Sequence, residues 1–250
     1  MRNRGWALFL LLAPSLSIPF EVLAQSRQGK TPSKALVGTT LARSDPCYQR
    51  LAATEKLTSY AITIPPRGST LLGSHPSDYL LLSLVDSQLE VTGPSGNTYA
   101  IQLGQEEMQV MKGGWTHRLT NLGDRSARLI EVDVEHNIRP EHASCGLAAT
   151  PCTDGRFGKT EERTYSTTTL FETPTVKLTR VELGPRGTFE RHTHRGSEML
   201  IALTPIHLSQ GALENVDKAP GETRAYPAGT THQIRNIGSE AARFLELEAK

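Results

Sequence analysis

An internal repeat divides this 250-residue chain into two halves of related sequence. The segments GWTHRLTNLGDRSARLIEVD (residues 114–133) and GTTHQIRNIGSEAARFLELE (residues 229–248) lie 115 residues apart. Upstream, PRGSTLLGSHPSDYLLLSL (66–84) and PRGTFERHTHRGSEMLIAL (185–203) lie 119 residues apart, so the first copy contains four additional residues between the two pairs. A fixed offset over such lengths predicts two copies of one structural unit in series. The pairs that are identical in the downstream segments are Gly114/Gly229, Thr116/Thr231, His117/His232, Asn121/Asn236, Gly123/Gly238, Ala127/Ala242, Arg128/Arg243 and Glu131/Glu246.

Each copy has the pattern of β-structure. Residues 130–135 (IEVDVE) and 245–248 (LELE) alternate apolar and acidic side chains, which is typical of a strand with one buried face. The runs 80–85 (LLLSLV) and 199–203 (MLIAL) suit fully buried strands. Long patterns of helical period are absent, and the best helix candidate is residues 45–57, with Pro46 at its first position. The sequence therefore predicts an all-β protein made of two antiparallel sandwiches or barrels.

The first 24 residues have the features of a secretory signal peptide. Arg2 and Arg4 precede the apolar run 6–13, and Val22-Leu23-Ala24 forms a small-residue cleavage site. The alternative is a membrane anchor, but the uninterrupted run is far shorter than the roughly 20 residues of a span. We therefore expect a secreted chain, periplasmic or extracellular, cleaved after Ala24 and without a membrane span once mature.

Five segments follow from these observations. Residues 1–24 are the signal peptide, and residues 25–50 form a polar segment that is expected to be disordered. Residues 51–140 form the first barrel, residues 141–163 a linker, and residues 164–250 the second barrel. The formal net charge of +1 gives no reason to expect a nucleic-acid partner.

Three cysteines fit an oxidising compartment, where disulfides persist. Cys145 and Cys152 are close in sequence and flank a stretch of small residues, so this pair is favoured, with Cys47 left over. Pairing of Cys47 with either of the others stays open. Zinc binding by these cysteines is not indicated, because the chain lacks a CxxC pair.

The second copy contains a cluster of metal-ligand residue types in the segment FERHTHRGSEML (189–200). On a strand, His192 and His194 project to the same side, and Glu198 returns after a turn at residues 195–197. His232 follows Gly229, which permits a sharp turn. Three imidazoles and one carboxylate suit one divalent ion, with Fe or Mn favoured and Co, Ni, Cu or Zn as alternatives.

The segments His192-x-His194-xxx-Glu198 and Gly221-x5-Pro227-x-Gly229-xx-His232-xxx-Asn236 together resemble the two signature motifs of the cupin superfamily. The second motif is complete. In the first, Gly187 is one residue nearer to His192 than usual, and Thr204-Pro205 stand where the family has a glycine. Together with the repeat, the chain after about residue 50 resembles a bicupin, two tandem jelly-roll β-barrels. The resemblance implies a metal inside the second barrel, bound by His192, His194, Glu198 and His232, and makes a homodimer plausible.

The first copy lacks half of this ligand set. Gly73 and Tyr79 stand in the places of His192 and Glu198, whereas His75 and His117 are retained. Two histidines bind a metal weakly at best, so the first barrel is expected to be metal-free and structural. The alternative is a ligand pocket in which Tyr79 is a donor.

Three functions fit such a site. The first is a metal-dependent dioxygenase for a small organic substrate, in which Glu198 is the catalytic residue that exchanges between metal ligand and proton acceptor. The second is a metal-dependent isomerase, epimerase or lyase, and the third is a non-catalytic protein that binds a small molecule. Strand parity predicts that Thr188 and Glu190 face the cavity with the histidines. The remaining wall, Leu200, Ala202 and Ile234, is either an apolar pocket or simply barrel core.

Overall fold

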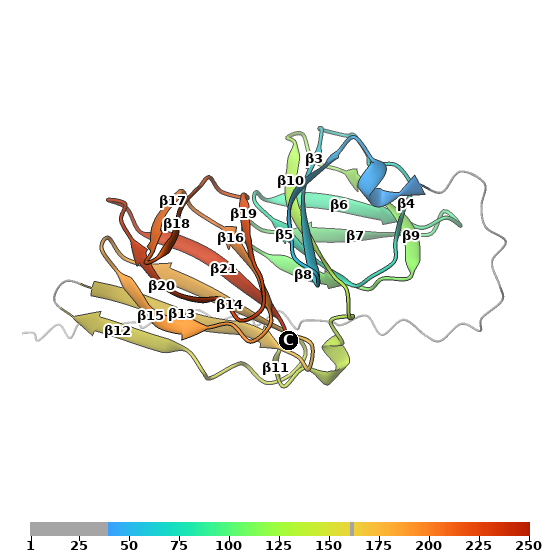
Figure 1. The fold of residues 1–250 in the computed structure, drawn as a ribbon. Coiled ribbons are helices and arrows are strands. Elements are labelled where there is room, and N and C mark those ends of the chain that lie inside the picture. Colours follow the sequence, from blue (N-terminus) through green and yellow to red (C-terminus); the bar gives the residue numbers. More distant parts are fainter. Residues whose placement is uncertain (1–39, 161–162) are drawn as a thin grey trace, which may run out of the picture.

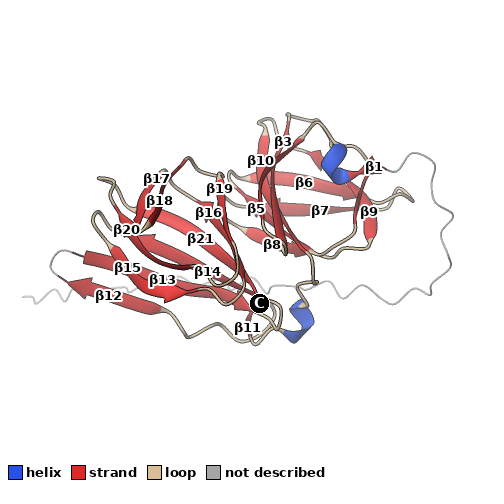
Figure 2. Cartoon of the chain, in the orientation of Figure 1, coloured by secondary structure: helices blue, strands red, loops and turns tan. Residues whose placement is uncertain are grey.

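A computed structural model describes residues 40–160 and 163–250, which form two β-barrels lying against each other (Figure 1). The expected signal peptide and the expected disorder of residues 25–39 lie outside the described residues. Apart from the short 3-10 turns η1 (Ala42–Ser44) and η2 (Pro140–His142), the regular structure of this part of the chain is all strand (Figure 2), which confirms the all-β prediction. Within the described ranges, none of the helices has the length and apolar character that crossing a membrane requires.

The first barrel consists of two five-stranded sheets. One sheet has the order β1-β4-β9-β6-β7 and the other β2-β3-β10-β5-β8, so neighbours in space are mostly distant in sequence, as in a jelly roll. The strands are β1 (Thr40–Leu41), β2 (Tyr48–Ala53), β3 (Leu57–Ile64), β4 (Gly73–His75), β5 (Tyr79–Ser83), β6 (Ser87–Thr92), β7 (Thr98–Leu103), β8 (Met108–Met111), β9 (Trp115–Asn121) and β10 (Ala127–Val134).

The second barrel repeats this arrangement with a seven-stranded and a four-stranded sheet. The first has the order β11-β13-β14-β21-β16-β19, with β12 paired to β13, and the second has the order β15-β20-β17-β18. The strands are β11 (Cys145–Gly146), β12 (Arg156–Thr160), β13 (Arg163–Glu172), β14 (Val176–Leu183), β15 (Thr188–Thr193), β16 (Ser197–Ala202), β17 (Ile206–Gln210), β18 (Leu213–Lys218), β19 (Thr223–Tyr226), β20 (Thr231–Asn236) and β21 (Ala242–Ala249).

The sequence repeat is also a structural repeat. β14 begins 119 residues after β3 and β21 begins 115 residues after β10, the two offsets of the sequence alignment. The offset changes between β6 and β7, because β17 begins 119 residues after β6 and β18 begins 115 residues after β7. The four additional residues of the first copy therefore lengthen its β6–β7 hairpin and leave the barrel unchanged.

The asparagine that both copies share, Asn121 and Asn236, has the same structural role in each barrel. Asn121 donates its side-chain amide to the carbonyl oxygens of Ile64, Pro65 and Arg125 at 3.1, 3.1 and 2.7 Å. Asn236 makes the same three bonds in the second barrel, at 3.2, 3.1 and 2.7 Å. Each asparagine therefore fixes the turn before the last strand of its barrel by satisfying buried carbonyl groups.

An apolar layer joins the two barrels, and we call it the inter-barrel core. It is formed by alternate residues of β3, β5 and β10 on one side and of β14, β16 and β21 on the other. The remaining residues of the same strands face the interior of their own barrel. Both faces of these strands are thus buried, which explains the continuous apolar runs at 80–85 and 199–203. The layer includes Leu80, Leu82, Ile130, Val132, Met199, Ile201, Leu245 and Leu247.

Three sequence expectations about the segments between the barrels and before them need correction. The helix expected over 45–57 is wrong, because this stretch contains β2 and the start of β3. A carboxylate oxygen of Asp45 accepts a hydrogen bond from the amide of Cys47 at 2.7 Å in a local turn, and the chain then pairs with β3. The segment 25–50 is ordered from residue 40, and the linker 141–163 contains η2, β11 and β12.

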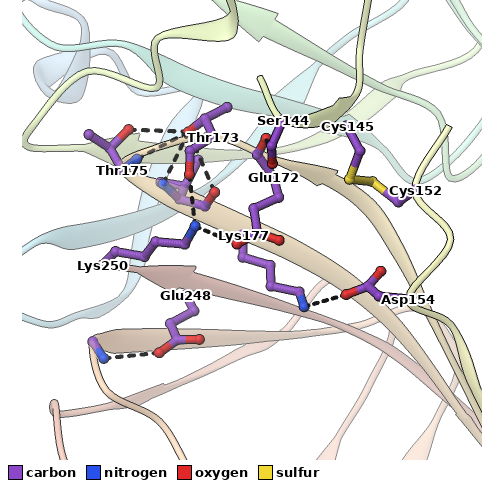
Figure 3. Close-up of polar contacts among 12 residues, drawn as sticks. Ser144, Cys145, Cys152, Asp154, Glu172, Thr173, Thr175, Lys177, Glu248 and Lys250 are labelled. Carbon is purple, nitrogen blue, oxygen red and sulfur yellow. Dashed lines mark hydrogen bonds and ion pairs between the residues drawn. A yellow bond between two sulfur atoms is a disulfide. The ribbon is translucent and has the colours of Figure 1, made fainter. Parts of the chain in front are cut away.

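The favoured disulfide is confirmed, since Cys145 and Cys152 are bonded (Figure 3). It lies beside an open hollow of about 550 Å³. Two ion pairs of 2.6 Å lie nearby (Figure 3). Lys177 of β14 pairs with Asp154, which follows the disulfide in the chain, and the C-terminal residue Lys250 pairs with Glu172 of β13. The third cysteine, Cys47, is free.

Candidate metal centre in the second barrel

The four predicted ligands come from both sheets of the second barrel. His192 lies near the end of β15, His194 follows that strand directly, Glu198 lies on β16, and His232 lies on β20. His192 and His232 are opposite each other in the β15–β20 pair. His194, Glu198 and His232 are buried, with 6%, 0% and 2% of their surface exposed, and His192 is half-buried at the mouth.

The three imidazoles converge through the same ring nitrogen. Nε2 of His194 lies 3.0 Å from Nε2 of His232, which lies 3.1 Å from Nε2 of His192. Nδ1 of His192 lies 2.8 Å from the carbonyl oxygen of Glu190, which can only accept, so Nδ1 carries the proton. The Nε2 atom of His192 therefore presents a lone pair, the form in which histidine binds a metal.

These spacings are those of a coordinated ion. Two ligands at bond lengths of about 2.1 Å in adjacent octahedral positions are separated by about 3.0 Å. Three Nε2 atoms this close repel one another unless a proton or a cation lies between them. The donor set thus fits a divalent metal on geometry as well as on chemistry.

Glu198 completes the predicted set and has no competing partner. Its Oε2 lies 2.8 Å from Nε2 of His194, but neither carboxylate oxygen has a hydrogen bond of normal geometry within the described chain. A fully buried carboxylate in that condition is costly unless a cation or a proton neutralises it. The group of Glu198 therefore also fits the role of a metal ligand.

A second buried carboxylate lies at the same point, and sequence reasoning missed it. Glu246 of β21 brings an oxygen within 4.8 Å of the ligand nitrogens of His192, His194 and His232. The residue is 6% exposed, and its Oε1 has no hydrogen-bond partner among the described residues. The signal was available in the sequence, because Glu246 is identical to Glu131 in the repeat.

The electrostatics of the centre favour uncharged forms of all these side chains except His194. Burial, followed by repulsion from His192 and His194, lowers the pKa of His232 to about 3, and burial also lowers the pKa of His192. Burial raises the pKa of Glu198, and burial with repulsion from Glu198 and Glu248 raises the pKa of Glu246 well above its usual range. Burial opposes the charging of His194, but Glu198 and Glu248 outweigh it and raise its pKa. Without a cation, the raised pKa values of Glu198 and Glu246 favour the protonated carboxyl groups over the carboxylates.

The expected lining of the cavity is partly corrected. A β-bulge between Phe189 and His192 adds one residue to β15 and reverses the strand parity. Phe189 therefore shares the face of His192, with ring centroids 4.4 Å apart, and Glu190 is exposed instead of facing the cavity. The opposite wall is barrel core, since Leu200, Ala202 and Ile234 are fully buried in it.

The corresponding place in the first barrel is filled by a stack of rings. The Tyr79 hydroxyl lies 2.8 Å from Nε2 of His117, at the positions equivalent to Glu198 and His232. The ring of His75 stacks on both of these rings, at centroid distances of 4.6 and 4.5 Å, and Trp115 stacks on His117 at 4.2 Å. Parallel rings with paired nitrogens do not converge on a common ion.

Glu131 and Asp133 lie beside this stack, and each contacts other protein groups. Oε2 of Glu131 accepts a hydrogen bond from the Tyr48 hydroxyl at 3.3 Å, and its Oε1 lies 3.4 Å from Nδ1 of His75. Asp133 pairs with Arg43 at 2.8 Å. The ligand atoms of His75, Glu131 and Asp133 are close enough for an ion, but protein groups already contact each of them.

Comparison with known proteins supports this description of the fold. No protein-family model and no curated protein matches the sequence. Among solved structures, a single-residue mutant of Bacillus subtilis oxalate decarboxylase OxdC matches with a TM-score of 0.55 at 15% identity, over 79% of this chain and 70% of that one. A structure from work on the Mn(II) centres of the same enzyme matches at 0.55 and 13%, over 81% and 75%.

A smaller protein matches over nearly its whole length. AerE from Microcystis aeruginosa has a TM-score of 0.55 at 9% identity, with 82% of this chain and 98% of that chain covered. At these identities the likeness concerns the fold. The tandem arrangement of two jelly-roll barrels is thus similar to the fold of oxalate decarboxylase. The chain therefore has the fold of these proteins, two cupin-type jelly-roll barrels in tandem, with a metal-capable cluster of histidine and glutamate residues in the second.

Proposed function

We propose that this protein is a secreted metal-dependent dioxygenase that acts on a small organic substrate in its second barrel. The observation that carries the proposal is the convergence of three Nε2 atoms at 3.0 and 3.1 Å beside the buried carboxyl group of Glu198, whose contact at 2.8 Å is with one of the same nitrogens. His192, His194 and His232 with Glu198 would hold one divalent ion, and an octahedral ion has further positions beyond these four. The first barrel would serve as a structural partner.

Iron or manganese is the favoured metal. Three imidazoles with one or two carboxylates suit both ions, and Mn(II) centres are present in oxalate decarboxylase, which shares the fold. Cobalt, nickel, copper and zinc accept the same donors. A redox-active ion would activate dioxygen, which is the chemistry that side chains alone do not supply.

The protein side chains have three tasks in this proposal. The histidines hold the centre rigid, because each projects from a paired strand or the adjoining turn. Glu198 would exchange between metal ligand and base, and in the second role it would accept the proton of a hydroxyl group of the substrate. Phe189 and Tyr165, whose rings lie 5.8 Å apart, offer apolar surface next to His192 for an uncharged or aromatic substrate. In the balanced reaction, one substrate and one dioxygen give a product that contains both oxygen atoms.

The second candidate is a metal-dependent lyase, and its support comes from oxalate decarboxylase, which has the same architecture. In a decarboxylation, a divalent ion can stabilise negative charge on the substrate while carbon dioxide leaves. A non-catalytic small-molecule binder has the same site but no turnover.

Metal analysis and gas exchange separate these functions. The protein, purified without a histidine tag, is analysed for bound metal by mass spectrometry and reconstituted with Fe(II) or Mn(II). Catechols, flavonols, small diketones and oxalate are then tested in an oxygen electrode and in a carbon dioxide assay. Oxygen uptake that depends on substrate supports the dioxygenase, and carbon dioxide release without net oxygen uptake supports the lyase. A protein that binds no transition metal at micromolar concentration contradicts both.

Secretion and dimerisation have their own tests. Expression of the full chain in a bacterium, followed by fractionation and mass spectrometry of the intact protein, is expected to give a periplasmic form that begins at Gln25. Light scattering would report a homodimer, for which the family resemblance is the support.

A further inference from the structure

We infer that Glu246 is the second carboxylate of the metal centre, so that the ion is held by three histidines and two glutamates. This inference rests on the proposed metal site and adds to it a residue that lies outside both sequence motifs. It concerns the composition and charge of the centre, and it predicts which substrates the centre can accept.

The position of Glu246 follows from the packing of β21. Leu245 and Leu247 on either side of it belong to the inter-barrel core. Since successive side chains of a strand alternate, Glu246 is directed into its own barrel. It lies opposite Leu200 of β16, a residue of that interior, and one of its oxygens comes within 4.8 Å of all three ligand nitrogens.

The repeat shows that this glutamate has been left without its protein partner. Glu131, the equivalent residue of the first barrel, accepts a hydrogen bond from the Tyr48 hydroxyl at 3.3 Å. The residue 119 positions after Tyr48 is Thr167, on β13. The hydroxyl of Thr167 instead accepts a hydrogen bond from the amide of Arg156 at 3.2 Å. Among the described residues, Oε1 of Glu246 is buried without a hydrogen-bond partner, as expected for an atom that binds an ion. Oε1 of Glu131 also lacks a hydrogen bond, but it has the imidazole of His75 at 3.4 Å, and its Oε2 is bonded to Tyr48.

The charges of the site also call for a cation. Within the described chain, no lysine or arginine forms an ion pair with Glu198 or Glu246, and the contact of Glu198 is with His194. Glu248, which is half-buried, is held through an oxygen that accepts from the amide of Gly196 at 3.0 Å (Figure 3). One divalent ion would neutralise Glu198 and Glu246 together. The two buried carboxylates therefore cost less free energy with the ion between them than they do without it.

A neutral centre has a consequence for specificity. With a single carboxylate, a divalent ion keeps one positive charge and attracts an anionic substrate. With Glu246 added, that charge is cancelled, and a dianion would enter against the repulsion of two carboxylates. The site is thus suited to uncharged substrates, and oxalate is expected to bind poorly.

Manganese titration of four proteins tests the inference. The wild type, Glu246→Gln, Glu198→Gln and the matched control Glu131→Gln are titrated with Mn(II), and free ion is followed by electron paramagnetic resonance. Glu246→Gln is expected to raise the Kd at least about tenfold, and Glu131→Gln to change it less than about twofold. Thermal unfolding of the metal-free proteins shows that each variant is folded. Equal affinities for Glu246→Gln and Glu131→Gln would overturn the inference.

The result also separates this inference from the proposed function. If the wild type binds neither Mn(II) nor Fe(II), the proposed centre itself is absent. If the wild type and Glu246→Gln bind equally and Glu198→Gln does not, the centre exists without Glu246. At saturating Mn(II), oxalate is then added to wild type and Glu246→Gln. Tighter oxalate binding by Glu246→Gln supports the neutral centre, and equal binding contradicts it.

Discussion

The hydroxyl of Tyr79 and Nε2 of His117 are joined by a 2.8 Å hydrogen bond, at the two positions where the second barrel directs Glu198 and His232 to its candidate ion. The phenol thus occupies a nitrogen that a metal would need. In Tyr79→Phe the buried Nε2 of His117 loses its partner, and the free energy of unfolding is expected to fall by about 1–3 kcal/mol. Bound metal per chain is expected to stay unchanged. Urea denaturation and metal analysis measure the two effects. Loss of metal would show that the first barrel takes part in binding.

The repeat supplies a matched pair of histidine variants. His232→Ala removes one of three converging nitrogens, and bound metal after dialysis is expected to fall at least about tenfold. His117→Ala removes the equivalent residue of the first barrel, and the metal content is expected to stay at the wild-type level. Mass spectrometry of the metal in both proteins is the measurement. A similar loss in both variants would contradict the assignment of the site to one barrel.

Asp133 makes stability depend on pH. Burial, and then repulsion from Glu131, raise the pKa of this carboxyl from 3.8 to about 7, despite the ion pair with Arg43. Between about pH 4 and 7 the folded chain keeps a proton that the unfolded chain has released. The contribution of Asp133 to the free energy of unfolding therefore falls as pH rises through this window, by up to about 1.4 kcal/mol per pH unit. Asp133→Asn is expected to flatten this part of the profile.

Urea denaturation at several values between about pH 4.5 and 8 compares the two proteins. Other groups titrate in both, so the difference between wild type and Asp133→Asn isolates this residue. Parallel profiles would mean that Asp133 has an ordinary pKa in the folded chain.

Cys47 is expected to be a slow nucleophile. Burial, followed by the nearby carboxylate of Asp45, raises the pKa of its thiol to about 11. The reactive thiolate is then about 100-fold scarcer at pH 8 than in a thiol of ordinary pKa. Alkylation by iodoacetamide, followed by mass spectrometry, is expected to be at least about tenfold slower in the native protein than in urea. Asp45→Asn should speed the native reaction, and an unchanged rate would exclude the carboxylate as a cause.

The sequence was sufficient for the two barrels and the histidine cluster because both depend on local spacing. The repeat indicated the architecture, and the HxH spacing with a distant His232 brought the three nitrogens to one place. The sequence was insufficient where a β-bulge reversed the face of the strand to which the side chains point. The bulge in β15 directs Phe189 to the face of His192 and leaves Glu190 exposed. The alternation of residues in this segment does not predict such a bulge.

The glutamates of the last strands show a second limit. The alternation at 245–248 predicts one buried and one solvated face, but both faces of β21 are covered. The leucines contact the other barrel, and Glu246 faces the interior of its own. A pattern of period two separates the two faces of a strand, but it does not say which face meets water. The identity of Glu131 and Glu246 across the repeat was the better indicator.

The inter-barrel core makes the first barrel part of the packing of the second. Leu80, Leu82, Ile130 and Val132 cover the back of the sheet from which Glu198 and Glu246 reach inward. A fragment that starts near residue 141 would keep every candidate ligand, but it would expose the apolar face of this sheet to water. We therefore expect the second barrel to depend on the first for its stability.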